Sequence, residues 1–435
     1  MSTLTPALQG NFRIKYGPWI DALPEIDTIA SMLPFQPKEY QPGEKYRVPF
    51  LAGIEHGQTA SRAGGLFNLN KPKGAEVPYA ELDGSTIIMR AQYALDDVYA
   101  SLNGQSNGAY QDVMSLKMKA KGMGASLYRD LALSYGPGAG SVLAANIGVV
   151  STTATAVNTS PSVRLTKASF IPGLWPSMKN ALVDIYQSDG TTLRAGNVQV
   201  LGLTNNNKTQ VKFGVSTVSG EATVNPAAVV TAGDIIVPQG WKGGSCIGIE
   251  AMANTQTGTI FTVDLTNIPI FRWSQFDAAA GPLTRKLIRE WGARASQFGC
   301  KQGGVLKVAA SAFAGLAEEF SALNRDTSMG GVKKQGETAL VFETPAGLIS
   351  VEVWELAKQS QAIFFAKSAN GYRVGATDNT MRPIKGINEA FLTPLIDQPG
   401  LQSMMYSNQA PFFDRPWHNF IVSNIVSPGD VPDAA

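Results

Sequence analysis

The chain contains 435 residues, of which 36 are Lys or Arg and 34 are Asp or Glu, so its formal net charge is +2. Charged residues make up 16% of the sequence, well below the roughly 25% of an ordinary soluble domain. This balance excludes a protein that binds nucleic acid through a strong positive field of its own. The apolar content of 44% excludes global disorder, and two cysteines with two histidines are too few for a disulfide scaffold or a thiolate zinc site.

No targeting signal or membrane span is predicted. The N-terminal residues lack the cationic start and apolar core of a secretory signal, and no apolar stretch approaches the roughly 18 residues that cross a bilayer. We therefore expect synthesis in the cytosol and no membrane partner. No constellation of carboxylates, histidines and cysteines indicates a metal site or a cofactor, and we expect neither.

The first 93 residues predict two extended limbs. Six prolines within residues 1–45 oppose a long helix and predict an N-terminal arm, with a short helix near residues 23–33. Residues 46–93 predict a long hairpin, in which the β-prone runs YRVPFLAGI and STIIMRAQY flank a segment rich in Gly, Pro and Asn. A loop of this length usually has a function, and its middle is basic because it carries Arg62, Lys71 and Lys73.

Residues 108–133 predict one long helix, within a segment that spans 94–150. The apolar residues recur every three or four positions, which is the period of one helical face, and a Gly-Pro pair at 136–137 ends the pattern. Gly122 and Gly124 lie near the centre, where each glycine costs about 1 kcal/mol relative to alanine. We interpret them as a place where the helix bends or packs closely.

The composition changes between residues 151 and 270, where few residues are charged and Thr, Val, Asn and Gly dominate. Short strand-like segments separated by turn sequences predict a small antiparallel sheet or barrel there. Helices are then predicted at 282–298 and 308–322, and β-prone segments lie between residues 339 and 375. An aromatic tail broken by prolines ends the chain.

One enzymatic motif has to be weighed. The sequence GQSNG at residues 104–108 fits the G-x-S-x-G pattern of serine hydrolases, with Ser106 as the nucleophile and His418 as the histidine downstream. That pattern requires a buried strand before the serine, whereas the preceding residues are mixed and polar. The alternative is that Ser106 or Asn107 caps the long helix. We predict a structural protein and not an enzyme, with the hydrolase as an alternative.

Two of the predicted helices carry clustered bases. Lys117 and Lys121 share one face of the long helix, and Arg285 and Arg289 lie in the helix at 282–298. A solvated helix face is the ordinary interpretation of each cluster. The alternative is that one or both faces an interior polyanion such as DNA, or an acidic neighbouring subunit.

The order of these parts resembles the major capsid proteins of tailed bacteriophages, which have the Hong Kong 97-like capsid fold of the α+β class. The passage SNGAYQDVMSLKMKAKGMGASLYRDLALSYGPGAG is the most similar to that family, and the order and spacing of the parts carry the resemblance. The resemblance implies these domains: an N-terminal arm (1–45), an extended E-loop hairpin (46–93), a peripheral domain with a spine helix (94–150), an inserted β-rich domain (151–270), a peripheral-domain helix (271–299), an axial domain (300–390) and a C-terminal return to the peripheral domain (391–435).

The resemblance also implies a function. Such a chain self-assembles into pentamers and hexamers of an icosahedral shell, which encloses double-stranded DNA without sequence specificity and expands from procapsid to mature virion. The implied partners are a separate scaffolding protein, a portal protein and a decoration protein. The low charge suits large apolar interfaces, and Gly122 with Gly124 would let the spine helix change shape on expansion. Subunit contacts are expected in the limbs, at Phe12, Trp19, Arg62, Lys71 and Lys73.

Two further points follow from the resemblance. Some relatives join subunits by Lys–Asn isopeptide bonds, and Lys71 and Lys73 lie suitably in the predicted hairpin, but the sequence identifies no partner Asn and no promoting carboxylate. A shell of the same fold that encloses protein cargo, as in the encapsulins, is an alternative. Encapsulin chains are generally shorter and lack the extra β domain, which favours the virus.

Overall fold

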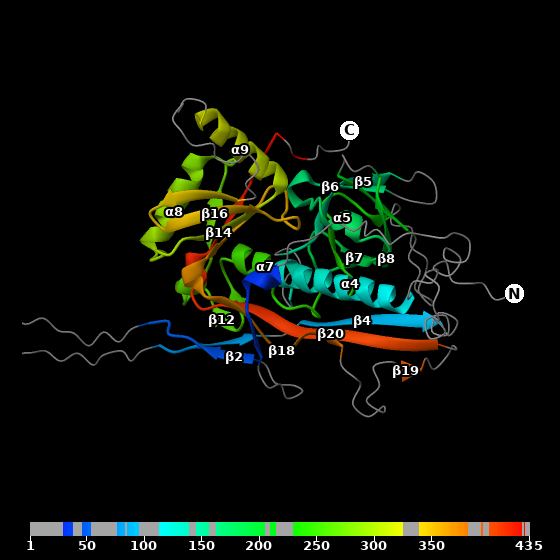
Figure 1. Ribbon diagram of the computed structural model, residues 1–435. Coiled ribbons are helices and arrows are strands. Elements are labelled where there is room, and N and C mark those ends of the chain that lie inside the picture. Colours follow the sequence, from blue (N-terminus) through cyan, green and yellow to red (C-terminus); the bar gives the residue numbers. More distant parts are fainter. Residues whose placement is uncertain are drawn as a thin grey trace, which may run out of the picture.

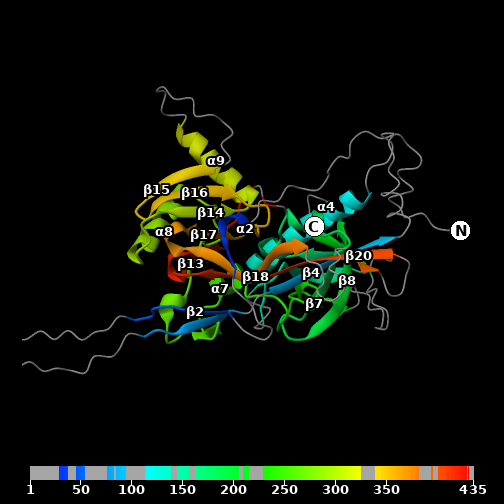
Figure 2. The same ribbon diagram turned by 60° about the horizontal axis from the view of Figure 1, so that its bottom comes forward.

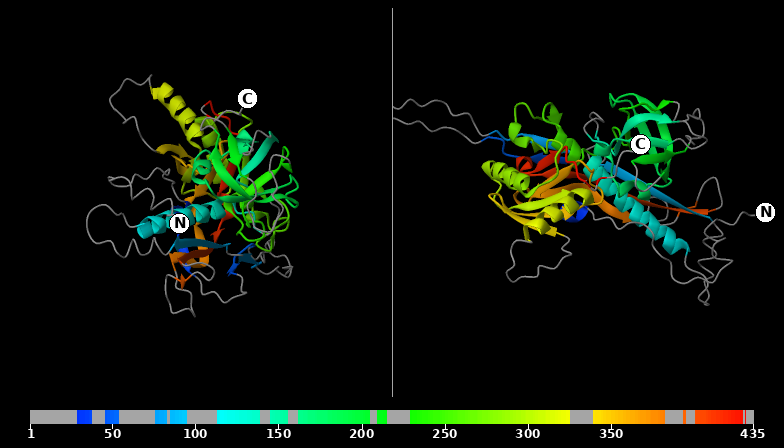
Figure 3. Two further views of the ribbon diagram at one scale, coloured as in Figure 1. Left: turned by 90° about the vertical axis from the view of Figure 1, so that its right-hand side faces the viewer. Right: turned by 90° about the horizontal axis from the view of Figure 1, so that it is seen from above.

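The computed structural model describes residues 29–37, 46–53, 76–82, 85–94, 113–138, 145–155, 162–204, 209–214, 229–324, 339–381, 393–394, 400–428 and 430. Their strands form a five-stranded sheet, a closed barrel and a six-stranded sheet, together with two small two-stranded sheets. Figure 1 shows the barrel and the six-stranded sheet side by side above the five-stranded sheet, and the view from above in Figure 3 again shows the barrel and the six-stranded sheet side by side. No helix in the described part of the chain is long and apolar enough to cross a membrane.

The five-stranded sheet is built on the long strand β20 (Gly400–Phe413). This strand pairs antiparallel with β18 (Gly371–Met381), with β4 (Ser85–Ala94) and with β19 (Thr393–Pro394). The short strand β1 (Phe35–Pro37) adds in parallel to β18. Helix α4 (Val113–Tyr135) lies along this sheet against β4 and β20 (Figure 1).

Strand β20 lies in the tail that the sequence pattern interpreted as broken by prolines. Pro411 is inside the strand, although a proline has no backbone N–H to donate. The pairing with β4 ends at Gln409, so at Pro411 the strand β20 has β18 as a neighbour but no longer β4. A proline is tolerated where a strand is paired on one side, which is why this tail forms a strand after all.

The pairing expected for the hairpin is partly wrong. Strand β2 (Tyr46–Pro49) pairs with β3 (Tyr79–Leu82), and not with residues 85–93. Those residues form β4, as a strand was expected there, but β4 pairs with β20. The second arm of the hairpin therefore continues into the five-stranded sheet, because β4 begins three residues after β3 ends.

Helix α4 is the described part of the long helix expected at 108–133, since residues 108–112 lie outside the described residues. The helix runs without interruption through Gly122 and Gly124. A Cβ atom added at Gly122 would meet no atom of the described residues within 4 Å. Close packing among the described residues therefore does not require a glycine at 122. That the helix bends there stays a prediction.

The barrel consists of β5 (Gly148–Thr155), β6 (Ser162–Leu165), β7 (Leu182–Tyr186), β8 (Leu193–Leu203), β9 (Gln210–Phe213) and β10 (Ile235–Pro238), closed in the order β10-β5-β6-β9-β8-β7. All six pairings are antiparallel, so a barrel, one of the two arrangements predicted, is what forms. Alternate residues point inward and are fully buried, as Val163 and Val211 are. Trp175 on the short helix α5 (Leu174–Ser177) is also fully buried.

The six-stranded sheet has the order β13-β21-β17-β14-β16-β15. Its strands are β13 (Ser274–Asp277), β14 (Gly304–Val308), β15 (Ala339–Thr344), β16 (Gly347–Val353), β17 (Ala362–Ala366) and β21 (Phe420–Ser423). Helix α8 (Arg285–Gln297) packs against β15, and α9 (Ala310–Asn324) packs against β16 (Figure 2). The hydroxyl of Thr284 accepts a hydrogen bond from Leu287 N at 3.4 Å and caps α8.

The strands group differently from the expected domain boundaries. Helix α8, from the segment 271–299 assigned to a peripheral domain, packs on the six-stranded sheet. Strand β18, from the segment 300–390 assigned to an axial domain, lies in the five-stranded sheet, while β21 in the tail 391–435 returns to the six-stranded sheet. Sequence order misleads here because the partner of a strand is decided by side-chain packing between segments far apart in the chain.

Candidate functional site

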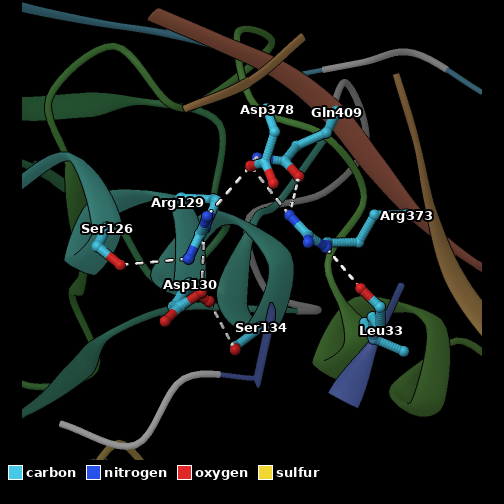
Figure 4. A network of polar contacts seen from close by, with 8 residues as sticks. All are labelled: Leu33, Ser126, Arg129, Asp130, Ser134, Arg373, Asp378 and Gln409. Atoms are coloured by element: carbon cyan, nitrogen blue, oxygen red, sulfur yellow. Dashed lines mark hydrogen bonds and ion pairs between the residues drawn. The ribbon is translucent and has the colours of Figure 1, made fainter. Parts of the chain in front are cut away.

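Both segments that lead toward the predicted limbs are fixed to the body of the protein. We call the first fixation point the arm anchor, which consists of Leu33, Ser126, Arg129, Asp130, Ser134, Arg373, Asp378 and Gln409 (Figure 4). The second is the hairpin anchor, which consists of Phe50, Glu81, Phe261, Phe271 and Phe412. These anchors decide where the limbs leave the molecule.

Arg373 on β18 is the centre of the arm anchor. Its side chain is 7% exposed, and its Nε donates to the carbonyl of Leu33 at 2.7 Å while its backbone N–H donates to the carbonyl of Pro34 at 2.9 Å. Its Nη1 donates to Gln409 Oε1 at 2.7 Å. Because the guanidinium presents its donors in a fixed fork, this one side chain binds the backbone just before β1 and ties it to β20.

Asp378 connects Arg373 to the long helix. Its Oδ1 accepts from Arg373 Nη1 at 3.1 Å and from Arg129 Nη1 at 3.1 Å. Figure 4 shows the two arginines, from β18 and α4, pointing toward this one carboxylate. The Asp378 side chain is 35% exposed, so solvent screens these ion pairs and their main effect is positional.

Asp130 lies beside this network and is completely buried. Its Oδ1 accepts from Arg129 Nε at 3.4 Å, whereas its Oδ2 has no hydrogen-bond partner in the described part of the chain. Burial raises the pKa of Asp130 to about 6, and the Arg129 guanidinium opposes this rise without cancelling it. The ionised carboxylate therefore costs folding free energy at neutral pH.

Replacement of this carboxylate gives a pH-dependent prediction. Because the pKa of Asp130 is raised above its ordinary value, the folded state binds the proton more tightly, and the stability of the native chain falls as pH rises from about 4 to about 6. Asp130→Asn is expected to raise the free energy of unfolding by roughly 1–3 kcal/mol at pH 8 and to lose that advantage near pH 4. Urea denaturation of both proteins across this range measures it. An equal gain at both ends would contradict the prediction.

The hairpin anchor is aromatic. The ring of Phe50 stacks on Phe271 with centroids 4.9 Å apart, and Phe271 lies 6.0 Å from Phe412 on β20. Next to them, Glu81 N donates to the carbonyl of Phe261 at 2.8 Å. The sequence pattern assigned Phe261 to the β-rich domain (151–270) and Phe271 to the peripheral-domain segment (271–299), but in the structure both support the base of the hairpin.

The turn that carries Phe261 has unusual backbone geometry. It joins β11 (Thr259–Ile260) to β12 (Val263–Asp264), and its two central residues, Phe261 and Thr262, have φ values of 51° and 65°. A two-residue hairpin turn needs such left-handed residues, which are usually Gly, Asn or Asp. No turn signal in the sequence marked this position, so pattern analysis missed it.

Apolar side chains are exposed near the base of the hairpin. Leu51 is 58% exposed, Val77 is 59% exposed and Tyr79 is 51% exposed. The Arg47 guanidinium lies 5.1 Å from the centroid of the Tyr79 ring and pairs with Glu81 at 2.9 Å. The paired strands at the base of the hairpin thus leave three large apolar side chains exposed within the described residues.

The structure describes only some of the residues that the sequence predicted to be functional. Those expected in the limbs, Phe12, Trp19, Arg62, Lys71 and Lys73, lie outside the described residues, as does Ser106. Lys117 lies on α4. Arg289 is exposed on α8, and Arg285 is half-buried, with its backbone N–H donating to Glu319 Oε2 at 3.1 Å.

Lys121 corrects the expectation of a basic, outward-facing helix surface. It is 5% exposed, and its Nζ donates to the carbonyl of Ser403 at 2.7 Å and to Ser403 Oγ at 3.0 Å. Burial lowers the pKa of Lys121 to about 8. Helical periodicity placed Lys121 beside Lys117, but it could not show that β20 covers that position.

His418, the histidine considered as a partner for Ser106, is buried beside a different serine. It is 4% exposed, and its Nδ1 is 2.8 Å from Ser368 Oγ, which lies 3.7 Å from Cys300 Sγ. Burial lowers the pKa of His418. The structure therefore pairs His418 with Ser368, and within the described residues no three His, Cys, Asp or Glu side chains are arranged to hold a metal ion.

Comparisons with known proteins place this architecture. No family model and no curated protein matches the sequence. Among solved structures, the capsid asymmetric unit of cyanophage A-1(L) matches with a TM-score of 0.51 and 11% identity, over 95% of this chain and 96% of that chain. The capsid of cyanophage P-SCSP1u matches with a TM-score of 0.44 and 10% identity, over 96% and 94%. An encapsulin complex from Synechococcus elongatus matches with a TM-score of 0.38 and 9% identity, over 96% and 95%.

The match to the A-1(L) capsid extends over nearly all of both chains and identifies the fold. The chain has mixed α and β structure and the fold of a tailed-phage major capsid protein. The resemblance inferred from the order of the parts in the sequence is thereby confirmed at the level of the fold.

Proposed function

We propose that this chain is the major capsid protein of a tailed bacteriophage, a structural subunit that builds a shell and has no catalytic activity. The observation that carries the proposal is the whole-chain match to the capsid of cyanophage A-1(L). In this proposal copies of the chain form the pentamers and hexamers of an icosahedral shell that encloses double-stranded DNA. The protein assembles in the host cytoplasm and resides in the virion.

The two anchors support assembly of many copies. The arm anchor and the hairpin anchor each fix a segment at the point where it meets the five-stranded sheet. Leu51, Val77 and Tyr79 then present apolar surface that is not buried within the described part of the chain. Contact with a neighbouring copy would bury this surface, and the near-neutral net charge of +2 limits repulsion among copies.

The partners are those that such a shell requires. A separate scaffolding protein guides assembly, a portal protein occupies one vertex, and a decoration protein binds the outer surface. DNA is held without sequence specificity, and Arg289, exposed on α8, is one candidate for an acidic or DNA-facing contact.

Sedimentation followed by electron microscopy tests this proposal. The purified chain, expressed with its scaffolding protein, is expected to form megadalton icosahedral particles. Particles from infected cells are expected to contain nuclease-protected double-stranded DNA, whereas protein cargo without DNA would indicate an encapsulin-like compartment. A chain that stays monomeric under all these conditions and reacts with a serine-hydrolase probe would refute the proposal in favour of the Ser106 hydrolase.

The central glycines of α4 give a prediction about shell shape. Gly122→Ala together with Gly124→Ala is expected to stabilise the isolated helix by about 1 kcal/mol at each position and to hinder assembly or expansion, because a stiffer spine helix adapts less to non-equivalent positions. Particle size distributions before and after expansion measure the effect. Ala120→Gly, in the same helix, is the matched control for a change in helix propensity. Normal particles of normal size from the double variant would refute the bending hypothesis.

A further inference from the structure

Three polar side chains from distant parts of the chain meet in the interior. Lys358 lies between β16 and β17, Glu250 lies in α7 (Ile249–Asn254), and Asn146 lies just before β5. The exposed fractions of these residues are 3%, 1% and 8%. The cluster thus joins the six-stranded sheet, the segment after the barrel and the start of the barrel at one buried point.

The distances within the cluster are short. The Nζ atom of Lys358 is 2.6 Å from Glu250 Oε1 and 2.8 Å from Glu250 Oε2. The same Nζ atom is 3.4 Å from Asn146 Oδ1, and the backbone N–H of Asn146 donates to Glu250 Oε2 at 3.4 Å. One carboxylate therefore contacts the amine and holds the residue that carries the side-chain amide.

The surroundings of the cluster are aromatic and buried. The Lys358 Nζ lies 5.1 Å from the centroid of the Tyr135 ring, and that ring stacks on Trp354 with centroids 6.0 Å apart. Tyr135 and Trp354 are each 1% exposed. Solvent is therefore excluded from the contacts among Lys358, Glu250 and Asn146, and the packed core holds the three groups against one another.

We propose that Lys358 and Asn146 are a modification site, at which Glu250 promotes an intramolecular isopeptide bond. Glu250 takes a proton from Lys358 Nζ, and the neutral amine attacks Cγ of Asn146. The Nζ–Cγ bond forms, the proton on Glu250 passes to Nδ2, and Glu250 takes the second proton from Nζ as the Cγ–Nδ2 bond breaks. The departing ammonia takes this last proton from Glu250 and leaves as ammonium, so the carboxylate is regenerated. The step needs no oxidant, metal or second substrate.

Proximity of the reacting groups accelerates this otherwise slow reaction. An amine and an amide in free solution do not condense at a useful rate, but groups held in contact react as though at a concentration of roughly 10⁵ M or more. Proton transfer by a positioned carboxylate contributes further acceleration. The fold itself provides both conditions, so the bond forms after folding and without an enzyme.

The bond would have a distinct topological effect. It joins residues that are 212 positions apart in the sequence, within one copy of the chain. It differs from the bonds between subunits considered for Lys71 and Lys73, since it adds no band above 46 kDa to a denaturing gel of particles. The proposal is therefore independent of the shell function and can be tested on the chain in any assembly state.

Mass spectrometry of the purified, denatured full-length chain tests the proposal. The expected intact mass is about 17 Da below the mass of the sequence, which is the loss of one ammonia. Trypsin is expected to release a branched peptide in which residues 130–164 are joined to residues 335–367, because modified Lys358 is no longer a cleavage site. An unmodified mass after prolonged incubation of the folded protein would overturn the proposal.

Variants identify the atoms involved. Lys358→Arg and Glu250→Gln are each expected to restore the full mass, whereas Lys307→Arg is expected to retain the loss. Lys307 is a matched control because it is 3% exposed and lies 3.0 Å from a carboxylate, that of Glu352. A loss of ammonia that persists in Lys358→Arg, or a lighter peptide 130–164 without a branch, would also overturn the proposal. If a variant does not fold, the branched peptide of the native chain decides the question alone.

Discussion

Relative to freshly folded native chain that has not yet lost ammonia, Glu250→Ala is expected to lower the free energy of unfolding by about 3–5 kcal/mol, which is the usual effect of leaving a buried charge without its partner. The carboxylate contacts Lys358 Nζ through both oxygens, and the two side chains are 2% and 3% exposed. Without Glu250, the ammonium of Lys358 keeps the amide oxygen of Asn146 at 3.4 Å, which does not compensate its charge. Chemical denaturation of the full chain measures the loss.

Two further variants show what this loss consists of. Glu290→Ala breaks a surface pair with Lys286 whose side chains are 50% and 83% exposed, and the expected change is within about 0.5 kcal/mol. The double variant Glu250→Leu with Lys358→Met removes both buried charges. Replacing a buried ion pair by apolar side chains often changes the free energy of unfolding very little. Relative to the native chain with its isopeptide bond, this double variant is expected to be about 5 kcal/mol less stable, because a closed loop that joins residues 212 positions apart is lost. An effect of Glu250→Ala no larger than that of Glu290→Ala would show that the buried pair is unimportant.

Arg373→Ala is expected to reduce stability by about 2–4 kcal/mol and to abolish assembly. It removes a charged donor from the Leu33 carbonyl and from Gln409 Oε1, both at 2.7 Å, and each buried hydrogen bond to a charged group is worth about 1.5–3 kcal/mol. Asp378 keeps Arg129 as a partner, which limits the loss. The segment before β1 then keeps its backbone contact at Pro34 and the β1–β18 pairing but loses the side-chain contact that fixes Leu33.

Stability and assembly are measured separately for this variant. Denaturation reports the first, and sedimentation of the chain with its scaffolding protein reports the second. Arg373→Lys keeps the charge but not the fork of donors, so we expect it to recover stability better than assembly. Lys286→Ala, whose side chain is 83% exposed, is the surface control and should assemble normally. Normal particles from Arg373→Ala would contradict the role assigned to the arm anchor.

The sequence predicted those parts of the fold that have a local signal. The apolar spacing around Leu127 and Leu131 specifies a helix whatever it packs on, and the alternation in the barrel strands places residues such as Val211 and Phe213 inside. Turn sequences separated the barrel strands correctly enough to indicate an antiparallel arrangement. Local patterns of this kind depend on neighbouring residues, which a single sequence shows directly.

The parts that were missed depend on residues far apart in the chain. Lys121 was assigned to an exposed face because nothing nearby shows that Ser403 covers it, 282 positions away. Glu250 and Lys358 are separated by 108 positions and belong to unrelated patterns. The hairpin anchor depends on Phe261 in a left-handed conformation, for which its sequence carries no turn signal. Pairings of this kind are decided by tertiary packing.

The continuity of β3 and β4 has a mechanical consequence for the molecule. Strand β4 starts three residues after the hairpin strand β3 and pairs with β20 residue by residue from Ser85↔Gln409 to Ala94↔Gly400. Tension applied to the hairpin is therefore transmitted along β4. It loads the backbone hydrogen bonds of that pairing together, in shear, and does not open them one after another from an end. The projecting strands are thus attached by a joint that resists pulling, and strain in the hairpin is conveyed to the centre of the five-stranded sheet.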